Sequence, residues 1–128
     1  MKQEIVTKEA PAAIGPYSQG IRIGDLVFVS GQLPIDSQNG EFAGDDILLQ
    51  TKKSLENIKA ILNKVGLDMK HIIKTTVYLN DMNDFKSMNE IYAQFFNHPF
   101  PARVAFEVAK LPKNALVEIE AIAYYQNK

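Results

Sequence analysis

The feature of this chain that most constrains its fold is a pair of alternating runs near the carboxyl terminus. Residues 103–108 and residues 115–125 each alternate with a period of two, and a turn-rich break at residues 110–114 separates them. Successive side chains of a strand point to opposite faces of a sheet, so each run predicts a strand with two distinct faces. We expect the two strands to pair as a hairpin.

This hairpin would bring charges of both signs to one face of the sheet, with Arg103 on the same side as Glu118 and Glu120. The opposite, apolar faces consist of Val104, Phe106 and Val108 in the first strand and of Val117, Ile119, Ala121 and Ala123 in the second. One interpretation is structural, because cross-strand Arg–Glu pairs each contribute up to about 1 kcal/mol. The functional interpretation is a binding site for a small anion, since the charges lie among small and apolar neighbours.

The composition is that of an ordinary soluble globular protein, with 46% hydrophobic and 23% charged residues. A length of 128 residues falls in the usual range for one domain, so we expect a single domain over residues 1–128. The net charge is −1 and Lys and Arg form no basic block, which argues against nucleic acid as a partner.

The residue types also exclude several kinds of site. Without cysteine there is no disulfide, no thiolate zinc site and no cysteine nucleophile. The two histidines, His71 and His98, lie far apart without metal-ligand spacing, and the glycines do not form a dinucleotide-binding fingerprint. We therefore expect no metal and no cofactor. No apolar stretch follows the amino terminus, so we expect no signal peptide, no membrane partner and a cytoplasmic location.

The first half of the chain predicts a hairpin followed by a helix. The dipeptide Gly24-Asp25 is a signal for a tight two-residue turn in a hairpin over residues 21–30. The helix is expected to be capped by Asp45 or Asp46 and to end at Gly66. Its apolar stripe consists of Leu48, Leu55, Ile58, Ile61, Leu62 and Val65.

The second half predicts a β-branched strand over residues 71–79 and then another helix. Asn83 or Asp84 is expected to cap this helix, and Pro99 and Pro101 to stop it. Its core-facing residues at helical spacing are Phe85, Met88, Tyr92 and Phe95. The resulting order is β-β-α-β-α-β-β, an α+β fold with one sheet and two helices.

The balance of helices and strands predicts an assembly of several subunits. Two helices cover only one face of a sheet, and the other face would carry Arg103, Glu118 and Glu120 beside apolar side chains. A partly apolar face that its own helices do not cover predicts oligomerisation. A ligand site would then lie between subunits.

Six segments together resemble one known family in their order and spacing. These segments are APAAIGPYSQ at 10–19, SGQ at 30–32, KTTVYL at 74–79, FPAR at 100–103, LPK at 111–113 and EIEA at 118–121. They look like the reactive intermediate deaminase family (Rid, also called YjgF-like), and the resemblance covers nearly the whole chain. It implies a homotrimer of chorismate-mutase-like subunits with clefts between them. The implied activity is hydrolysis of 2-iminoacids or their enamine tautomers to 2-ketoacids and ammonia.

The resemblance also assigns roles to individual residues. The carboxylate-binding arginine of the family falls on Arg103 and its catalytic glutamate on Glu118. Further cleft residues fall on Tyr17, Ser30 with the backbone of Gly31, and Asn89. Taken alone, these three side chains have structural alternatives: Tyr17 as a packing residue, Ser30 as a turn former and Asn89 on a solvated helix face. Where many members have a cysteine, this chain has Ala105, which leaves hydrolysis possible but speaks against thiol-linked roles.

The implied chemistry agrees with the residue types. A 2-iminoacid is a small planar carboxylate, and a guanidinium fork binds a carboxylate in a fixed orientation. Glu118 is suited to hold a water against the imine carbon and to pass its proton to the leaving nitrogen. The resemblance chooses Glu118 over Glu120, which strand parity does not separate. The alternative function is a trimeric 2-ketoacid-binding regulator or chaperone, while a ribonuclease fits the mild acidity poorly.

Overall fold

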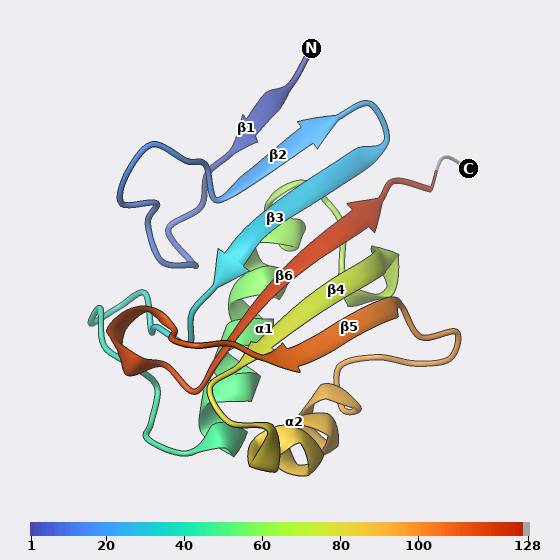
Figure 1. Ribbon diagram of the computed structural model, residues 1–128. Coiled ribbons are helices and arrows are strands. Elements are labelled where there is room, and N and C mark those ends of the chain that lie inside the picture. The colour runs from blue at the N-terminus through green and yellow to red at the C-terminus, as the bar shows by residue number, and fades with distance from the viewer. Residues whose placement is uncertain (127–128) are drawn as a thin grey trace.

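The elements of the chain follow the order β-β-β-α-β-α-β-β in a computed structural model that describes residues 1–126 (Figure 1). The strands are β1 (Gln3–Ile5), β2 (Gly20–Ile23), β3 (Leu26–Gln32), β4 (Ile72–Leu79), β5 (Ala102–Glu107) and β6 (Val117–Tyr124). The helices are α1 (Ile47–Lys64) and α2 (Phe85–Tyr92). The predicted order is confirmed apart from β1, whose three residues are too short to show alternation in the sequence.

The first predicted hairpin is present, and its turn explains the glycine. β2 and β3 pair antiparallel with Ile23 opposite Leu26, so Gly24 and Asp25 form the turn. Gly24 has a φ of 57°, in the left-handed region that a side chain disfavours.

Helix α1 begins and ends where the sequence predicts. The side chain of Asp46 accepts a hydrogen bond from the backbone N–H of Leu49 at 2.8 Å, and Gly66 follows the helix with a φ of 80°. The predicted stripe is wrong at Leu48, which is 41% exposed. The buried face of α1 is centred nearer to Ile47 and Ile58, so Leu48 lies at its border.

Helix α2 is shorter than predicted. A 3₁₀ turn over Met82–Asp84 precedes it, and Asp81 caps that turn by accepting from the backbone N–H of Asn83. Asp84 occupies the N-cap position of α2 but its side chain makes no capping hydrogen bond. The helix ends at Tyr92, well before the prolines that were expected to stop it, and Phe95 packs against the core from beyond the helix.

The predicted hairpin between the two alternating runs is wrong. The strand order is β1-β2-β3-β6-β4-β5, so β4 lies between β5 and β6. β5 pairs parallel to β4, and β6 pairs antiparallel to both β4 and β3. The reason is the crossover through α2, because a strand–helix–strand connection returns the chain parallel to the strand that it left.

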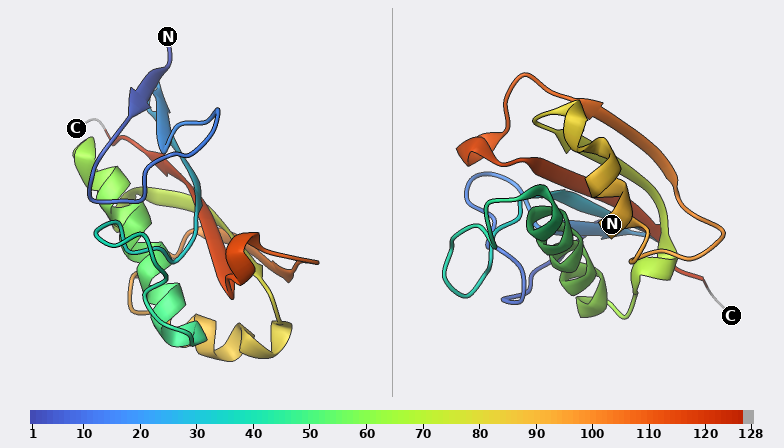
Figure 2. Two further views of the ribbon diagram at one scale, coloured as in Figure 1. Left: turned by 90° about the vertical axis from the view of Figure 1, so that its left-hand side faces the viewer. Right: turned by 90° about the horizontal axis from the view of Figure 1, so that it is seen from below.

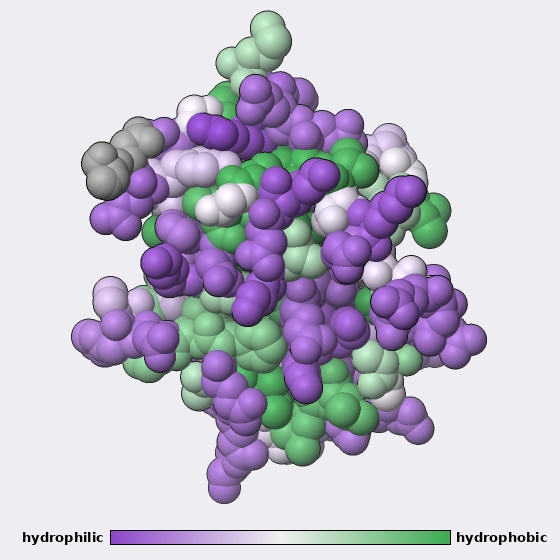
Figure 3. Space-filling model, turned by 180° about the vertical axis from the view of Figure 1, so that it is seen from behind, coloured by the Kyte–Doolittle hydropathy of each residue, from purple (hydrophilic) through white to green (hydrophobic). Residues whose placement is uncertain are grey.

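Both helices cover the same face of the sheet (Figure 2). α1 packs against β3, β6 and α2, and the core between them contains the fully buried side chains of Leu55, Ile58, Val77, Leu79 and Ile119. The outer surface on this side is mixed, with hydrophilic side chains around several hydrophobic areas (Figure 3). None of the helices within residues 1–126 has both the length and the hydropathy to cross a lipid bilayer.

Within residues 1–126, no helix or second sheet packs on the other face of the sheet (Figure 2). Phe28, Val104 and Phe106 lie on this open face and are each more than 40% exposed. Apolar side chains of this size are usually covered in a soluble protein.

The cap of α1 gives a test of the local fold. Asp46→Ala should lower the free energy of unfolding by about 1 kcal/mol, because the Leu49 N–H loses its acceptor. Asp45→Ala is the matched control, since the neighbouring exposed aspartate is not the cap. Denaturant unfolding of both variants measures the difference, and equal losses would contradict the assignment of Asp46.

Candidate functional site

The two glutamates of β6 project from the open face of the sheet. In the pairing of β6 with β4, Glu118 lies opposite Tyr78 and Glu120 opposite Thr76. The alternate residues of the strand, Val117 and Ile119, are buried on the helix-covered face. The alternation predicted for this strand is therefore present.

A β-bulge in β3 brings Ser30 and Gly31 against the glutamates. Val29 pairs with Ala121 and Gln32 pairs with Ile119, so β3 has one more residue than β6 in this interval. A Cβ at position 31 would overlap the carboxylate of Glu118, which lies directly on this glycine. Bulges of this kind redirect side chains and often occur beside binding sites. Sequence reasoning missed the bulge, for which Gly31 in a strand was the only signal.

A cavity of about 960 Å³ lies at this end of the sheet. Its walls come from the loop before β2, the bulge of β3, the loop after β3, and the turn between β5 and β6. The polar residues on its walls include Tyr17, Gln19, Ser30, Lys113, Glu118 and Glu120, and its apolar residues include Ile14, Leu33 and Ile35. Four of the six predicted site residues, counting the glycine, thus meet in one cavity.

The loop that carries Tyr17 is fixed by a buried amide that sequence reasoning missed. Gln19 is 3% exposed, and its Nε2 donates to the carbonyl oxygens of Thr7, Ala10 and Pro11. Its Oε1 accepts from the backbone N–H of Thr7 at 2.7 Å. Ser30 adds a second anchor, because its hydroxyl donates to the carbonyl oxygen of Ser18 at 2.6 Å. Tyr17 itself remains 52% exposed on the cavity wall.

Lys113 stands at the cavity in an unusual backbone conformation. It has a φ of 57° and Asn114 a φ of 60°, so two consecutive non-glycine residues occupy the left-handed region. This conformation costs about 1–3 kcal/mol per residue and is found most often at functional sites. The turn-rich break predicted at residues 110–114 is present here, but the pattern did not indicate a left-handed backbone at Lys113.

The electrostatic environment of Glu118 favours its neutral form. Glu118 is half-buried, and burial raises the pKa of its carboxyl, with the charge of Glu120 raising it further. Glu120 accepts a hydrogen bond from the Tyr78 hydroxyl at 3.0 Å. Within residues 1–126 no comparable hydrogen bond reaches Glu118, so its carboxylate is available to a ligand.

Arg103 and Asn89 form a second polar cluster at the far edge of the sheet. The guanidinium Nη1 of Arg103 donates to Oδ1 of Asn89 at 2.6 Å. The same guanidinium carbon lies 4.8 Å from the ring centre of Tyr92 and 5.5 Å from that of Phe85. These contacts hold an exposed cation in place between β5 and α2, with hydrogen-bonding nitrogens left for a ligand.

The prediction that Arg103 and Glu118 share one face within the chain is wrong. In the parallel pairing of β5 with β4, Arg103 lies opposite Thr75, which is buried on the helix-covered side and bonded to the Tyr92 hydroxyl at 2.7 Å. Glu118 lies opposite Tyr78, three residues further along β4 and on the other face. The inserted strand β4 separates the two charges, and they lie on opposite faces of one subunit.

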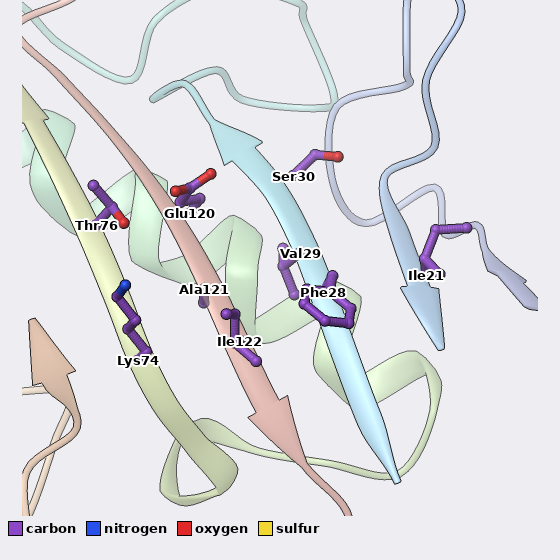
Figure 4. Close-up of a pocket in the computed structure, with 9 residues that line it drawn as sticks. All are labelled: Ile21, Phe28, Val29, Ser30, Lys74, Thr76, Glu120, Ala121 and Ile122. Atoms are coloured by element: carbon purple, nitrogen blue, oxygen red, sulfur yellow. The ribbon is translucent and has the colours of Figure 1, made fainter. Parts of the chain in front are cut away.

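The open face also contains a shallow hollow of about 300 Å³ between β2, β3, β6 and β4 (Figure 4). Glu120 lies there between Thr76 of β4 and Ser30 of β3, with Lys74 further along β4. The floor includes Phe28, Ala121 and Ile122. Among the residues that the structure describes, no three His, Asp or Glu side chains come together as a metal site would require.

The fold places the chain in a class of small α+β proteins for which many structures have been solved. One is the crystal structure of Escherichia coli TdcF with bound serine, which has a TM-score of 0.92 and 48% sequence identity. This similarity covers 97% of the present chain and 99% of the TdcF chain.

The family follows from comparison of the sequences. The model of the family described as Endoribonuclease L-PSP matches residues 7–125. A RutC family protein of Pyrococcus horikoshii is 56% identical over 124 residues, which are 97% of this chain and 98% of the relative. The 2-iminobutanoate/2-iminopropanoate deaminase of Salmonella typhimurium is 50% identical over 126 residues, with 96% and 98% covered. The chain therefore belongs to this family, the Rid or YjgF-like family that its motifs predict.

The close approach of Gly31 and Glu118 generates a test of the cavity. Gly31→Ala should leave the protein folded, because the overlapping atoms belong to the flexible end of Glu118, but should displace that carboxylate. We expect a loss of stability of about 1–3 kcal/mol and a larger loss in any activity that uses Glu118. Gly24→Ala is the control, because its strained turn affects stability at the opposite end of β3. Unchanged turnover in Gly31→Ala would contradict the placement of Glu118 at the site.

Proposed function

We propose that the protein hydrolyses 2-iminoacids, such as 2-iminobutanoate and 2-iminopropanoate, to 2-ketoacids and ammonia. The observation that carries this proposal is the half-buried Glu118 carboxyl, with its raised pKa, on the wall of a cavity also lined by Tyr17 and Ser30. A carboxyl with a raised pKa on the wall of a cavity is a candidate for proton exchange with a bound ligand. Relatives at about 50% identity that are named as 2-iminobutanoate/2-iminopropanoate deaminases support the choice of substrate.

The complete site is proposed to lie between two copies of the chain, in a homotrimer. Arg103 and Glu118 lie on opposite faces of one subunit, so they meet only if Arg103 of one copy approaches Glu118 of another. The exposed apolar side chains of the open face provide a surface for such an assembly. In the proposed trimer, this head-to-tail contact closes into a ring and gives three equivalent clefts.

Arg103 is proposed to bind the carboxylate of the substrate. Its guanidinium is oriented by Asn89 and by the rings of Tyr92 and Phe85, so it offers a planar fork with little freedom left to lose. A carboxylate held by this fork would present its imine carbon in one orientation, which is the main requirement for a reaction whose substrate is already electrophilic.

Glu118 of the adjoining subunit is proposed to handle the protons. It takes a proton from a water as the water oxygen bonds to the carbon of the protonated imine, whose double-bond electrons move to nitrogen and give a carbinolamine. It then returns the proton to the amine nitrogen, the carbon–nitrogen bond breaks with its electron pair leaving on ammonia, and the Glu118 carboxylate takes the proton of the hydroxyl as the carbonyl forms. Burial and the charge of Glu120 raise the pKa of Glu118, which makes its carboxylate a stronger base toward the water proton than the carboxylate of an exposed glutamate. Serine bound to a relative, TdcF, supports a small amino-acid-like ligand for this fold.

Release of ammonia from 2-iminobutanoate tests the proposal directly. The substrate is generated in the assay by a threonine dehydratase, and the rate is compared with the rate in buffer. Turnover far above buffer supports the enzyme. Binding of 2-ketobutyrate without turnover would contradict the deaminase proposal and would instead support a ligand-binding regulator that uses the same cleft.

The assembly has its own expected result. Because the open face carries exposed apolar side chains that residues 1–126 leave uncovered, the protein should be a trimer of about three times 14.3 kDa in light scattering at micromolar concentration. A monodisperse monomer would contradict both the assembly and the shared site.

Substitution of Arg103 tests the binding of the substrate carboxylate. The kcat/KM of Arg103→Lys should fall nearly as far as that of Arg103→Ala, because an ammonium offers a point charge without a planar fork. Loss of a charge-assisted hydrogen bond costs about 1.5–3 kcal/mol, which is roughly 10- to 150-fold in kcat/KM. The other arginine provides the control: Arg22→Lys alters a cation stacked on Tyr125, away from both clusters. Near-normal turnover by a trimeric Arg103→Ala protein would falsify the assignment.

Substitution of Glu118 tests the proton transfer. Glu118→Gln keeps the shape of the side chain but removes the base, and turnover should fall about 10²- to 10⁴-fold. Trimer assembly and binding of 2-ketobutyrate should remain. In the unsubstituted protein, turnover should fall as the pH drops through the pKa of Glu118, which burial raises above its ordinary value, because Glu118 must be ionised to accept a proton. Glu118→Gln activity comparable to that of the unsubstituted protein rules out this role.

A further inference from the structure

A second carboxylate stands beside Glu118, and the deaminase mechanism proposed above does not use it. Glu120 is two residues from Glu118 on the same face of β6, so their Cα atoms are about 6.5–7 Å apart. Both line the cavity of about 960 Å³, and both also line a smaller hollow of about 360 Å³. The pair therefore forms part of the wall between these two spaces.

Glu120 is held in place by a tyrosine from the neighbouring strand. Tyr78 lies opposite Glu118 in the sheet, but its hydroxyl donates to Oε2 of Glu120 at 3.0 Å. Its ring is fixed in turn by Phe106 of β5, with ring centres 5.5 Å apart and planes at 83°. Burial raises the pKa of Tyr78, and the hydrogen bond and charge of Glu120 raise it further, so the hydroxyl keeps its proton and remains a donor.

The charged and titratable groups around Glu118 come from several elements. The groups that share one or both spaces with it are Tyr17 in the loop before β2, Tyr78 in β4, Lys110 and Lys113 between β5 and β6, and Glu120 on its own strand. Among them, Glu120 is the nearest along the strand and the one with an anchored carboxylate. Lys110 and Lys113 are exposed, so water screens their effect.

We propose that Tyr78 and Glu120 are positioning residues for the deaminase reaction, and that they hold a fixed negative charge beside Glu118 so that Glu118 readily accepts a proton from water. The catalytic role in this inference rests on the proposed function. The hydrogen bond from Tyr78 to Glu120 is a feature of the structure itself. Glu120 is not itself proposed to touch the substrate.

The physical effect is the repulsion of like charges. Ionised Glu120 disfavours a second negative charge on Glu118, and the hydrogen bond from Tyr78 prevents Glu120 from turning away to relieve the repulsion. The charge of Glu120 contributes, after burial, to the raised pKa of Glu118. Without Tyr78 the flexible Glu120 side chain is free to move into solvent, where screening weakens the interaction.

The test follows the titration of Glu118 and the pH dependence of turnover in the same variants. The side-chain carboxyl carbon of Glu118 is observed by NMR in protein labelled at glutamate, and its signal is assigned by its loss in Glu118→Gln. Glu120→Gln removes the charge and keeps the shape. Tyr78→Phe removes only the anchoring hydroxyl. Tyr124→Phe is the matched control, because it removes an exposed tyrosine hydroxyl at the other end of β6.

The expected result is a lower titration midpoint for Glu118 in Glu120→Gln and a smaller decrease in Tyr78→Phe. The acidic limb of kcat/KM should move the same way, so that below the midpoint of the unsubstituted protein Glu120→Gln retains about two- to tenfold more of its maximal activity. Tyr124→Phe should change neither quantity. A loss of stability alone would not move a titration midpoint.

Different outcomes separate this inference from the proposed function. Absence of ammonia release by the unsubstituted protein removes the deaminase proposal, and with it the catalytic role of the pair. Ammonia release together with an unchanged or raised Glu118 midpoint in Glu120→Gln overturns the inference alone. If Glu120→Gln does not fold, the Tyr78→Phe variant provides the test. An unchanged titration midpoint of Glu118 in Tyr78→Phe then overturns the inference.

Discussion

Strand β6 is the element on which the rest of this structure depends, because it pairs with β3 on one side and β4 on the other and has two chemically different faces. On the helix-covered face Val117, Ile119 and Ala121 are buried in the core, so their burial fixes which way the strand faces. The same alternation places the side chains of Glu118 and Glu120 on the open face. The positions of the proposed catalytic glutamate and its charged neighbour thus follow from hydrophobic packing on the reverse side.

The sequence predicted the features that depend on local pattern, and it failed where distant segments meet. Strand parity, the Gly24 turn and the Asp46 cap arise from residues close together in the chain, and each is present. The partner of β5 depends on the route of the chain through α2, which no local pattern records. Arg103 was therefore placed on the correct strand but on the wrong side of the sheet relative to Glu118. The bulge at Gly31 was missed because it is defined by the pairing of β3 with the distant strand β6.

The separation of the two charged clusters within one subunit is the reason that the proposed site requires two copies of the chain. Arg103 with Asn89 at one edge and Glu118 with Tyr17 in the cavity are each built and oriented within one chain. In the proposed mechanism one cluster binds the carboxylate and the other transfers the proton, so neither cluster alone is sufficient. The proposed assembly makes activity conditional on association, because only the contact between copies completes the site.

Subunit complementation measures this central point most directly. Arg103→Ala and Glu118→Gln chains, each inactive alone, are mixed by co-expression or by joint refolding, and the size of the mixed assembly is verified. If each site combines Arg103 of one chain with Glu118 of its neighbour, every mixed trimer contains one intact site, and an equal mixture should recover about a quarter of the normal turnover. A mixture that contains mixed trimers yet stays at the level of its parents would contradict a site shared between subunits.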